Sequence, residues 1–168
     1  GKKYLKKNNS EKVIVGPSES MSKSKKNTID PEEIISDYGA DAVRLFILSD
    51  SPPEKDIQWS EEGIASSHKF IQKIWVLHFE IMSVMEKNYS GEPEDKLTQY
   101  INKFIKSISH NLETFSYNVI VANMHEMHSF LSKEIVKKYS KITWINNYKK
   151  ILITLIPIIP HFANEALE

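Results

Sequence analysis

Apolar residues recur every three or four positions in four long stretches between residues 60 and 156, with polar residues between them. This spacing places the apolar side chains on one face of a helix. The apolar positions are Ile64, Ile71, Trp75, Ile81, Met82 and Met85 in the first stretch, Leu97, Ile101, Phe104, Ile105, Ile108, Leu112 and Phe115 in the second, Ile120, Met124, Met127 and Leu131 in the third, and Ile145, Tyr148, Leu152 and Leu155 in the fourth. Because short polar segments join the stretches, the pattern predicts a mainly α fold built on an antiparallel helical bundle.

Residues that begin or stop helices mark the ends of these stretches. Ser60 precedes the first stretch and is a good N-cap, and Ser90–Pro93 separates the first helix from the second. Pro157 and Pro160 stop the fourth helix, and a further helix is expected to begin near His161.

The first third of the chain follows a different pattern. Val13, Ile14 and Val15 form a β-branched run before Gly16-Pro17, which favours one strand of a short β-hairpin that leads into a loop. That loop, residues 18–28, consists of serines, lysines and other polar residues with one methionine, so it has little to contribute to a core.

Two short helices are expected after the loop. Asp30-Pro31 with Glu33 is a strong helix start, because Asp30 can accept a free backbone amide and proline suits the first turn. We expect this helix to end at Gly39 and a second, apolar-rich helix to cover residues 41–48.

Composition is that of a globular protein. The 168 residues are 40% hydrophobic and 26% charged, and no stretch has the roughly 18 to 20 uncharged apolar residues needed to cross a bilayer. The lysine-rich start lacks the apolar run of a secretory signal, and the absence of cysteine excludes disulfides and thiolate metal sites. We therefore expect a cytoplasmic protein without membrane contact.

The charges are unevenly distributed although the formal net charge is zero. Residues 1–26 hold eight lysines and two glutamates, a net charge of +6, which leaves 14 basic and 20 acidic residues, a net charge of −6, in the remainder. A positive field at one end steers phosphate-bearing ligands. A solvated basic arm is the alternative interpretation.

The segment from Ser20 to Asn27 carries the clearest chemistry. Its lysines alternate with hydroxyl residues, and it follows a glycine turn and precedes a capped helix. Ammonium groups and hydroxyls in a flexible loop are suited to binding phosphate. On composition alone, a plain solvated loop is the favoured interpretation, because loops rich in serine and lysine are common.

The order of the residues points to a family. Met21–Ser24, with Asn27 and Asp30-Pro31 after it, resembles the KMSKS signature of class I aminoacyl-tRNA synthetases. Four further segments resemble the aliphatic amino-acid subgroup and, within it, leucyl-tRNA synthetases: Tyr38–Asp41 with Arg44-Leu45, Ser51–Ser60, Tyr117–Ala122, and Pro157–His161 with Glu165. On this resemblance, residues 1–59 are the end of a catalytic domain with its signature loop (residues 18–28), and residues 60–168 are a helical-bundle anticodon-binding domain.

The resemblance also implies a reaction. Leucine attacks the α-phosphate of ATP, which is used as its Mg²⁺ complex, pyrophosphate leaves, and the leucyl group passes to tRNA(Leu). It implies that the signature loop closes over the triphosphate, with Lys23 as the catalytic cation and Met21, Ser22, Lys23, Ser24 and Lys25 as the ATP-binding residues. It names no tRNA-binding residue, and we expect a monomer with no metal site of its own.

The sequence departs from the family pattern at two positions. Ser20 stands where the first lysine of the signature is usual, and Lys26 stands where glycine is common. The family's His-Ile-Gly-His-type signature is absent from these 168 residues, as is a run of strands that predicts a Rossmann-like sheet. The chain alone is therefore not expected to activate leucine.

Two other functions are compatible with the pattern. A stand-alone RNA-binding helical module predicts affinity for tRNA that falls steeply with salt. A helical scaffold or interaction protein predicts no such affinity.

Several residues with tempting chemistry have simpler interpretations. His125 and His128 lack the zinc-helix spacing, so no metal is expected there. Met124 and Met127 have core spacing. Three further expectations are that Asp41 and Arg44 form a local or interhelical ion pair, that Trp59 is a hydrophobic anchor rather than a base-stacking platform, and that His161 is structural.

Overall fold

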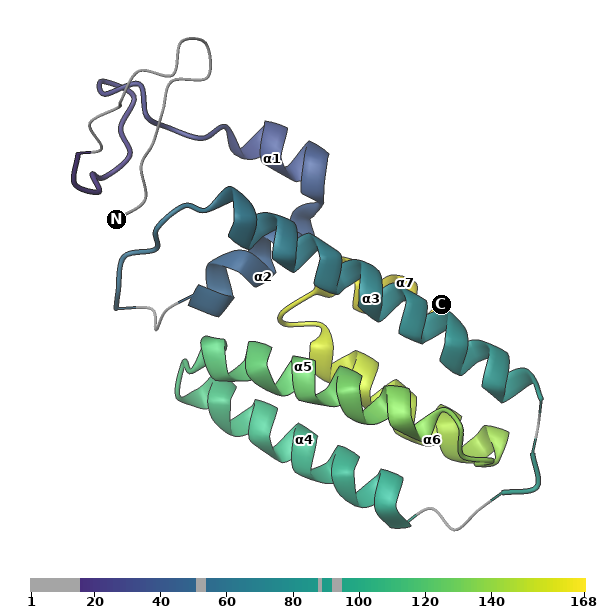
Figure 1. The fold of residues 1–168 in the computed structure, drawn as a ribbon. Coiled ribbons are helices and arrows are strands. Elements are labelled where there is room, and N and C mark those ends of the chain that lie inside the picture. Colours follow the sequence, from purple (N-terminus) through teal and green to yellow (C-terminus); the bar gives the residue numbers. More distant parts are fainter. Residues whose placement is uncertain (1–15, 51–53, 88, 92–94) are drawn as a thin grey trace. The chain divides into compact units, whose positions relative to one another are not determined.

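The computed structural model describes residues 16–50, 54–87, 89–91 and 95–168. It divides the chain into two compact units, Gly1–Asp30 and Pro31–Glu168. The described part of the second unit contains seven helices (Figure 1): α1 (Pro31–Tyr38), α2 (Ala40–Asp50), α3 (Glu61–Glu86), α4 (Asp95–Glu113), α5 (Tyr117–Glu134), α6 (Lys141–Leu155) and α7 (Pro160–Glu165). The described residues contain no strand, and the predicted β-hairpin at Val13–Val15 lies outside them.

The two short helices form where they were predicted. Gly39 separates α1 from α2 and has a φ of +83°, which a residue without a Cβ adopts at little cost. α2 buries Ala42, Leu45 and Phe46, and it packs against α3, α5 and α7.

The longest of the described helices, α3, begins as predicted, and its buried face matches the predicted positions in part. The Ser60 hydroxyl accepts the Gly63 amide at 3.1 Å and caps the helix. The buried residues are Ile64, Ser67, Phe70, Ile74, Leu77, His78, Ile81, Val84 and Met85. Met82 is exposed, and Ile71 and Trp75 are only partly buried. α3 carries apolar residues on more than one face, so spacing alone does not identify the face that packs inward.

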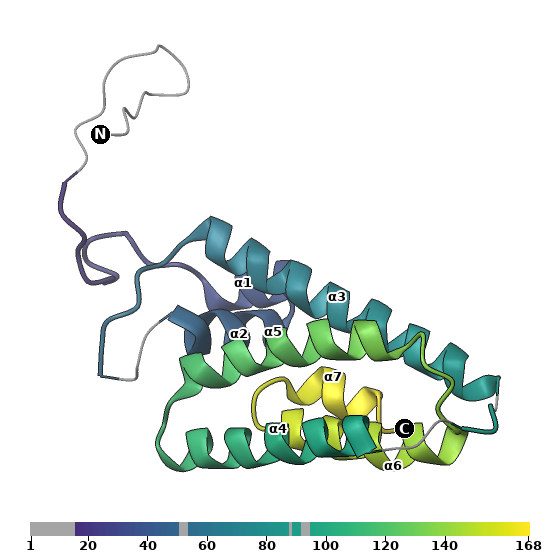
Figure 2. The same cartoon turned by 60° about the horizontal axis from the view of Figure 1, so that its bottom comes forward.

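α3, α4, α5 and α6 form the predicted four-helix bundle, in which successive helices run in opposite directions (Figures 1 and 2). α5 packs against α3 and α4, and α6 packs against the same two helices. α3 and α4 are consecutive in sequence but lie diagonally across the bundle. The bundle therefore also has parallel neighbours, α3 with α5 and α4 with α6.

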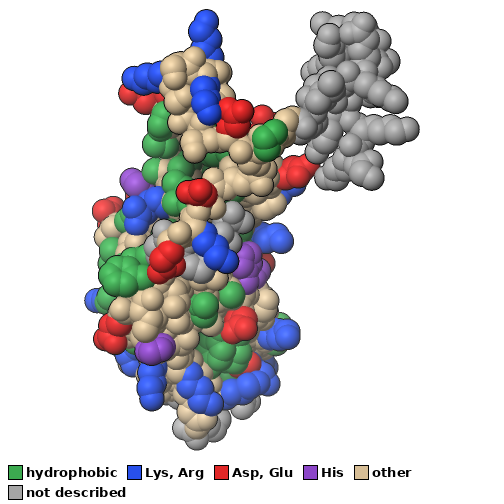
Figure 3. Space-filling model, turned by 90° about the vertical axis from the view of Figure 1, so that its left-hand side faces the viewer, with side chains coloured by type: hydrophobic (Ala, Val, Ile, Leu, Met, Phe, Trp, Pro, Cys, Tyr) green, Lys and Arg blue, Asp and Glu red, His purple; other side chains and the backbone are tan. Residues whose placement is uncertain are grey.

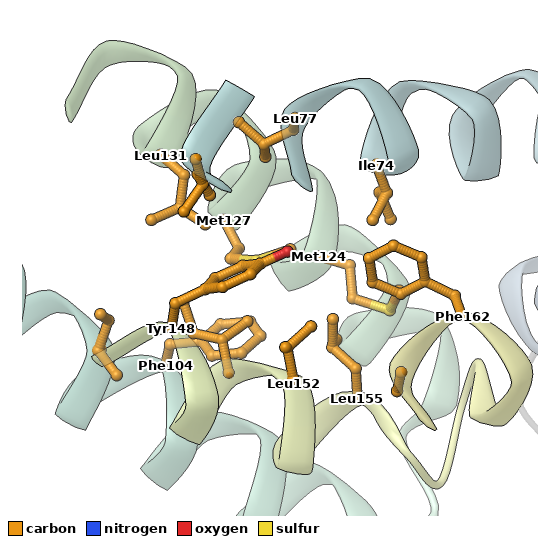
Figure 4. Close-up of a cluster of buried hydrophobic side chains, with 14 of the residues drawn as sticks. Ile74, Leu77, Phe104, Met124, Met127, Leu131, Tyr148, Leu152, Leu155 and Phe162 are labelled. Atoms are coloured by element: carbon orange, nitrogen blue, oxygen red, sulfur yellow. The ribbon is translucent and has the colours of Figure 1, made fainter. Parts of the chain in front are cut away.

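The core lies between these four helices and α7. Figure 4 shows side chains from all five converging: Ile74 and Leu77 from α3, Phe104 from α4, Met124, Met127 and Leu131 from α5, Tyr148, Leu152 and Leu155 from α6, and Phe162 from α7. The two methionines are fully buried, which confirms that they pack in the core. Two predicted core positions are exposed instead, Phe115 after the end of α4 and Ile145 on α6.

A smaller cluster joins α2 to the start of α3. Ala42, Phe46 and Ile64 are buried in it, and Trp59 packs edge-on against the Phe46 ring with the ring centroids 5.4 Å apart. This confirms Trp59 as a hydrophobic anchor. None of the described helices combines the length and the apolar character needed to span a bilayer.

Candidate functional site

The signature loop forms a tight turn in the first unit. The Lys25 amide donates to the Ser22 carbonyl and the Lys26 amide donates to the Lys23 carbonyl, each at 3.2 Å. Lys26 has a φ of +53°, a left-handed conformation that is costly for any residue with a Cβ. Glycine, which the resemblance leads one to expect at this position, adopts the conformation without that cost.

Asn27 holds the two sides of the loop together. Its Oδ1 accepts the Ser22 amide at 2.8 Å, and its Nδ2 donates to the Ser20 carbonyl at 3.4 Å. The sequence marks Asn27 as part of the motif but does not show this role. The loop therefore has a defined shape although nearly all of it is exposed.

The two serines of the motif lie within the same turn. The Ser22 and Ser24 hydroxyls are 3.2 Å apart, and the Ser22 hydroxyl also accepts the Lys25 amide at 3.3 Å. Met21 is exposed and packs in no core cluster. All five predicted ATP-binding residues thus lie on one short exposed turn.

The lysines of the loop differ in their partners. The Lys25 ammonium binds the Glu19 carboxylate at 2.8 Å, with both side chains about half exposed. The Lys23 side chain is exposed, and no ion pair joins it to another described residue. Glu19 was not singled out from the sequence. Its pairing engages the Lys25 ammonium and not that of Lys23.

In the second unit, Asp41 binds the start of α7 and not Arg44. The buried Asp41 carboxylate accepts the backbone amides of His161 at 3.2 Å and Phe162 at 2.7 Å, and His161 Nδ1 lies 2.9 Å from the same carboxylate. Arg44 donates to the Pro157 carbonyl at 2.7 Å and to the Ile158 carbonyl at 3.1 Å.

The predicted ion pair between Asp41 and Arg44 is therefore wrong. A carboxylate satisfies the unpaired amides at a helix start, and a guanidinium satisfies the carbonyls of the preceding turn. Both side chains fasten α2 to the segment between α6 and α7, and His161 has the structural role expected of it.

Two histidines connect other elements of the second unit. His68 Nδ1 lies 2.8 Å from the Tyr38 carbonyl at the end of α1, which ties that helix to α3. On α3, His78 is buried, with Nδ1 3.0 Å from the Tyr148 hydroxyl of α6. Burial lowers the pKa of His78.

His125 and His128 belong to the packing between α3 and α5. The His125 ring stacks on Phe70 with the centroids 3.7 Å apart, and burial, His128 and Lys73 lower the pKa of His125. Burial is also the main cause that lowers the pKa of His128. Among the described residues, no group of three or more His, Cys, Asp or Glu side chains is placed to hold a metal ion.

Comparison with known proteins gives these features a family context. Residues 13–60 match the family described as tRNA synthetases class I (I, L, M and V). The chain is 40% identical to a leucine–tRNA ligase of Rickettsia typhi over 98% of its length, and 37% identical to one of Allorhizobium ampelinum over 92% of its length. The chain is homologous to leucine–tRNA ligases.

The leucine–tRNA ligase homology extends through both units, from the signature loop to the last helix. The chain spans about a fifth of these relatives, 20% of the first and 19% of the second. The fold is similar to part of the LeuRS–tRNA–LeuAMS ternary complex of Agrobacterium radiobacter, with a TM-score of 0.75, 20% identity, and coverage of 87% of this chain and 20% of that one.

Proposed function

We propose that this chain is the part of a leucine–tRNA ligase that carries the signature loop and the tRNA-binding bundle. The observation that supports this most directly is 36–40% identity to leucine–tRNA ligases over 92–98% of the chain. The proposed substrates of the whole enzyme are leucine, ATP as its Mg²⁺ complex, and tRNA(Leu), and its proposed place of action is the cytoplasm, as a monomer.

The proposed roles follow the two domains that were predicted from the sequence. Residues 1–59 complete the catalytic domain, and residues 60–168 form the anticodon-binding domain. α2 belongs to the first part but packs against α3 and α5 of the second, so the two share a hydrophobic core. Because of this packing, α2, which follows the signature loop and α1 in the sequence, is held against the bundle.

Lys23 is the proposed catalytic cation of leucine activation. The leucine carboxylate forms a bond to the α-phosphorus of ATP, the bond from that phosphorus to the bridging oxygen breaks, and pyrophosphate leaves with the electron pair. Negative charge grows on the leaving group, and an ammonium held beside it lowers the barrier. Ser22, Ser24 and Lys25 contribute hydroxyls and a second charge, and Met21 completes the turn.

A substitution of Lys23 in the full-length enzyme that contains this chain tests the proposal. Lys23→Ala is expected to slow ATP–pyrophosphate exchange by roughly 10² to 10³, the loss typical of one preorganised donor. Because leucine does not contact this loop in the proposed mechanism, its apparent KM should change little.

Lys25→Ala is the matched control on the same turn. Lys25 already pairs with Glu19, so its removal should slow exchange less than removal of Lys23. Exchange close to the wild-type rate in Lys23→Ala would refute the catalytic role. A larger loss in Lys25→Ala than in Lys23→Ala would transfer that role to Lys25.

A stand-alone RNA-binding module is the weaker candidate. The matched family model covers residues 13–60, a segment that a bare RNA-binding bundle does not need. A gel shift of this chain with leucine tRNA at two salt concentrations distinguishes an RNA-binding module from a helical scaffold. Only an RNA-binding protein gives a complex whose amount falls with salt.

A further inference from the structure

Phe115 occupies a backbone position that normally belongs to glycine. It follows the end of α4 with a φ of +54°, and its amide donates to the Leu112 carbonyl at 3.3 Å. The Ser116 amide donates to the Asn111 carbonyl at 2.8 Å. These two bonds define a Schellman motif in which Phe115 is the left-handed residue, where glycine or asparagine is preferred.

The fold offers no packing reason for a phenylalanine at this position. The Phe115 side chain is 60% exposed, and its only ring contact with a described residue is an edge-on approach to Tyr117 with the centroids 6.1 Å apart. A bulky residue in the left-handed region is strained, and such strain is concentrated at functional sites. The tip of the α4–α5 hairpin therefore carries an exposed aromatic ring at a position where the backbone conformation favours glycine or asparagine.

The exposed face of α4 leads to this ring and is basic. Lys103, Lys106 and His110 follow one another at intervals of three and four, so they share one face, and all three are exposed. No acidic residue occurs between Lys96 and Leu112, and Glu113 is the first to follow. Figure 3 shows Lys and Arg side chains over the lower part of the surface, with some acidic side chains among them.

We propose that Phe115 and the basic face of α4 form an RNA-binding surface, in which Phe115 stacks on an unpaired base and Lys103 and Lys106 bind phosphates. The identity of that RNA as tRNA(Leu) rests on the proposed function. Ammonium groups in a row that ends at an exposed aromatic ring match the backbone and the base of a single-stranded or looped RNA segment. An acidic protein segment would also suit the lysines, but the exposed aromatic ring at the end of the row favours RNA, whose bases stack on such rings.

The test compares folding and binding in the same variants. Phe115→Gly and Phe115→Asn relieve the left-handed strain, so the midpoint of thermal unfolding should stay the same or rise. Both variants should bind a leucine tRNA transcript more weakly, by roughly 5- to 150-fold, which is the loss that removal of one stacked base produces. A residue with only a structural role would not give equal or higher stability together with weaker binding.

Two substitutions distinguish stacking from simple apolar contact. Phe115→Trp retains an aromatic face and should keep the affinity, whereas Phe115→Leu retains only apolar area and should lose it. Val136→Ser is the control for an exposed apolar residue, since Val136 is 79% exposed just beyond the opposite end of α5. It should leave the affinity unchanged.

The lysines are tested through the salt dependence. Lys103→Gln and Lys106→Gln should each lower the slope of log affinity against log salt by about 1, the effect of one lost phosphate contact. Lys137→Gln changes an exposed lysine just beyond the C-terminal end of α5 and should leave that slope unchanged.

Each outcome decides for or against the surface. Wild-type affinity in Phe115→Gly, full affinity in Phe115→Leu, or no binding of tRNA by the wild-type chain at low salt overturns it. If the wild-type chain binds leucine tRNA and an unrelated tRNA equally and Phe115→Gly weakens both, the RNA surface stands while the proposed identity of the RNA does not.

Discussion

At the scale of single residues, three positions show where the backbone restricts the choice of side chain. Phe115 and Lys26 adopt left-handed conformations that glycine would adopt more easily, whereas Gly63 lies where any larger residue meets a neighbour. None of these three properties can be inferred from the residue type alone. Each depends on backbone angles or on a contact between separate helices.

Gly63 provides a direct test of this crowding. A Cβ at position 63 would lie 2.6 Å from Cε2 of the buried Phe46 ring, and that ring also packs against Trp59. The helix preference for alanine favours Gly63→Ala by up to about 1 kcal/mol, but overpacking costs about 1–3 kcal/mol. We expect the variant to lose about 1 kcal/mol of unfolding free energy, measured by urea denaturation.

Ser66→Ala is the control, one turn further along α3 at an exposed position. It should change the unfolding free energy by no more than about 0.5 kcal/mol. A Gly63→Ala protein more stable than wild type would show that the Phe46 ring moves aside without cost.

At the scale of elements, the helix ends were the most predictable feature and the faces the least. Ser60 caps α3 and Gly39 ends α1 as their chemistry requires, because a capping bond forms between residues a few positions apart. The predicted face of α3 matches only in part: Ile64, Ile81 and Met85 are buried, whereas Met82 is exposed. α3 also carries apolar residues on its exposed side, at Val76 and Phe79. Which face packs inward depends on α5 and α6, which the sequence of α3 does not contain.

The partners of Asp41 and Arg44 illustrate the same limit within the second unit. A carboxylate and a guanidinium three positions apart suggest a local pair, but their actual partners lie 113 to 121 positions away. In the signature loop, by contrast, the motif was recognisable because its residues are contiguous. The bonds of Asn27 and Glu19 that shape the loop were not.

Removal of the Asp41 carboxylate should destabilise the second unit. Asp41→Ala leaves the His161 and Phe162 amides without their acceptor and is expected to cost about 3 kcal/mol, as for hydrogen bonds to a buried charge. Thermal or urea unfolding measures the loss. Asp37→Ala, an exposed carboxylate on α1, should cost no more than about 0.5 kcal/mol, and equal losses in the two variants would contradict the role given to Asp41.

At the scale of the whole molecule, the histidines make stability depend on pH. Burial is the largest cause that lowers the pKa of His78, His125 and His128 below the ordinary value of 6.5. The unfolded chain therefore binds more protons than the folded chain when the pH is below about 6.5. Stability is fully present above that pH and falls on acidification until the folded histidines are themselves protonated.

Urea denaturation at pH 7.5, 6.5 and 5.5 measures this dependence. The unfolding free energy should decrease from the first pH to the last, most steeply below about 6.5. His78→Gln removes one contributor next to Tyr148 and should reduce the difference between pH 7.5 and 5.5. An unchanged difference in this variant would mean that His78 is protonated as readily in the folded chain as in the unfolded chain.

The attachment of α2 to the start of α7 also has a consequence for synthesis on the ribosome. Asp41 emerges about 120 residues before the amides that it binds, since the separation is 120 residues to His161 and 121 to Phe162. At about 5–20 residues per second, that interval lasts roughly 6 to 24 s. Throughout it the nascent α2 helix carries a carboxylate whose final hydrogen-bond donors have not yet been translated.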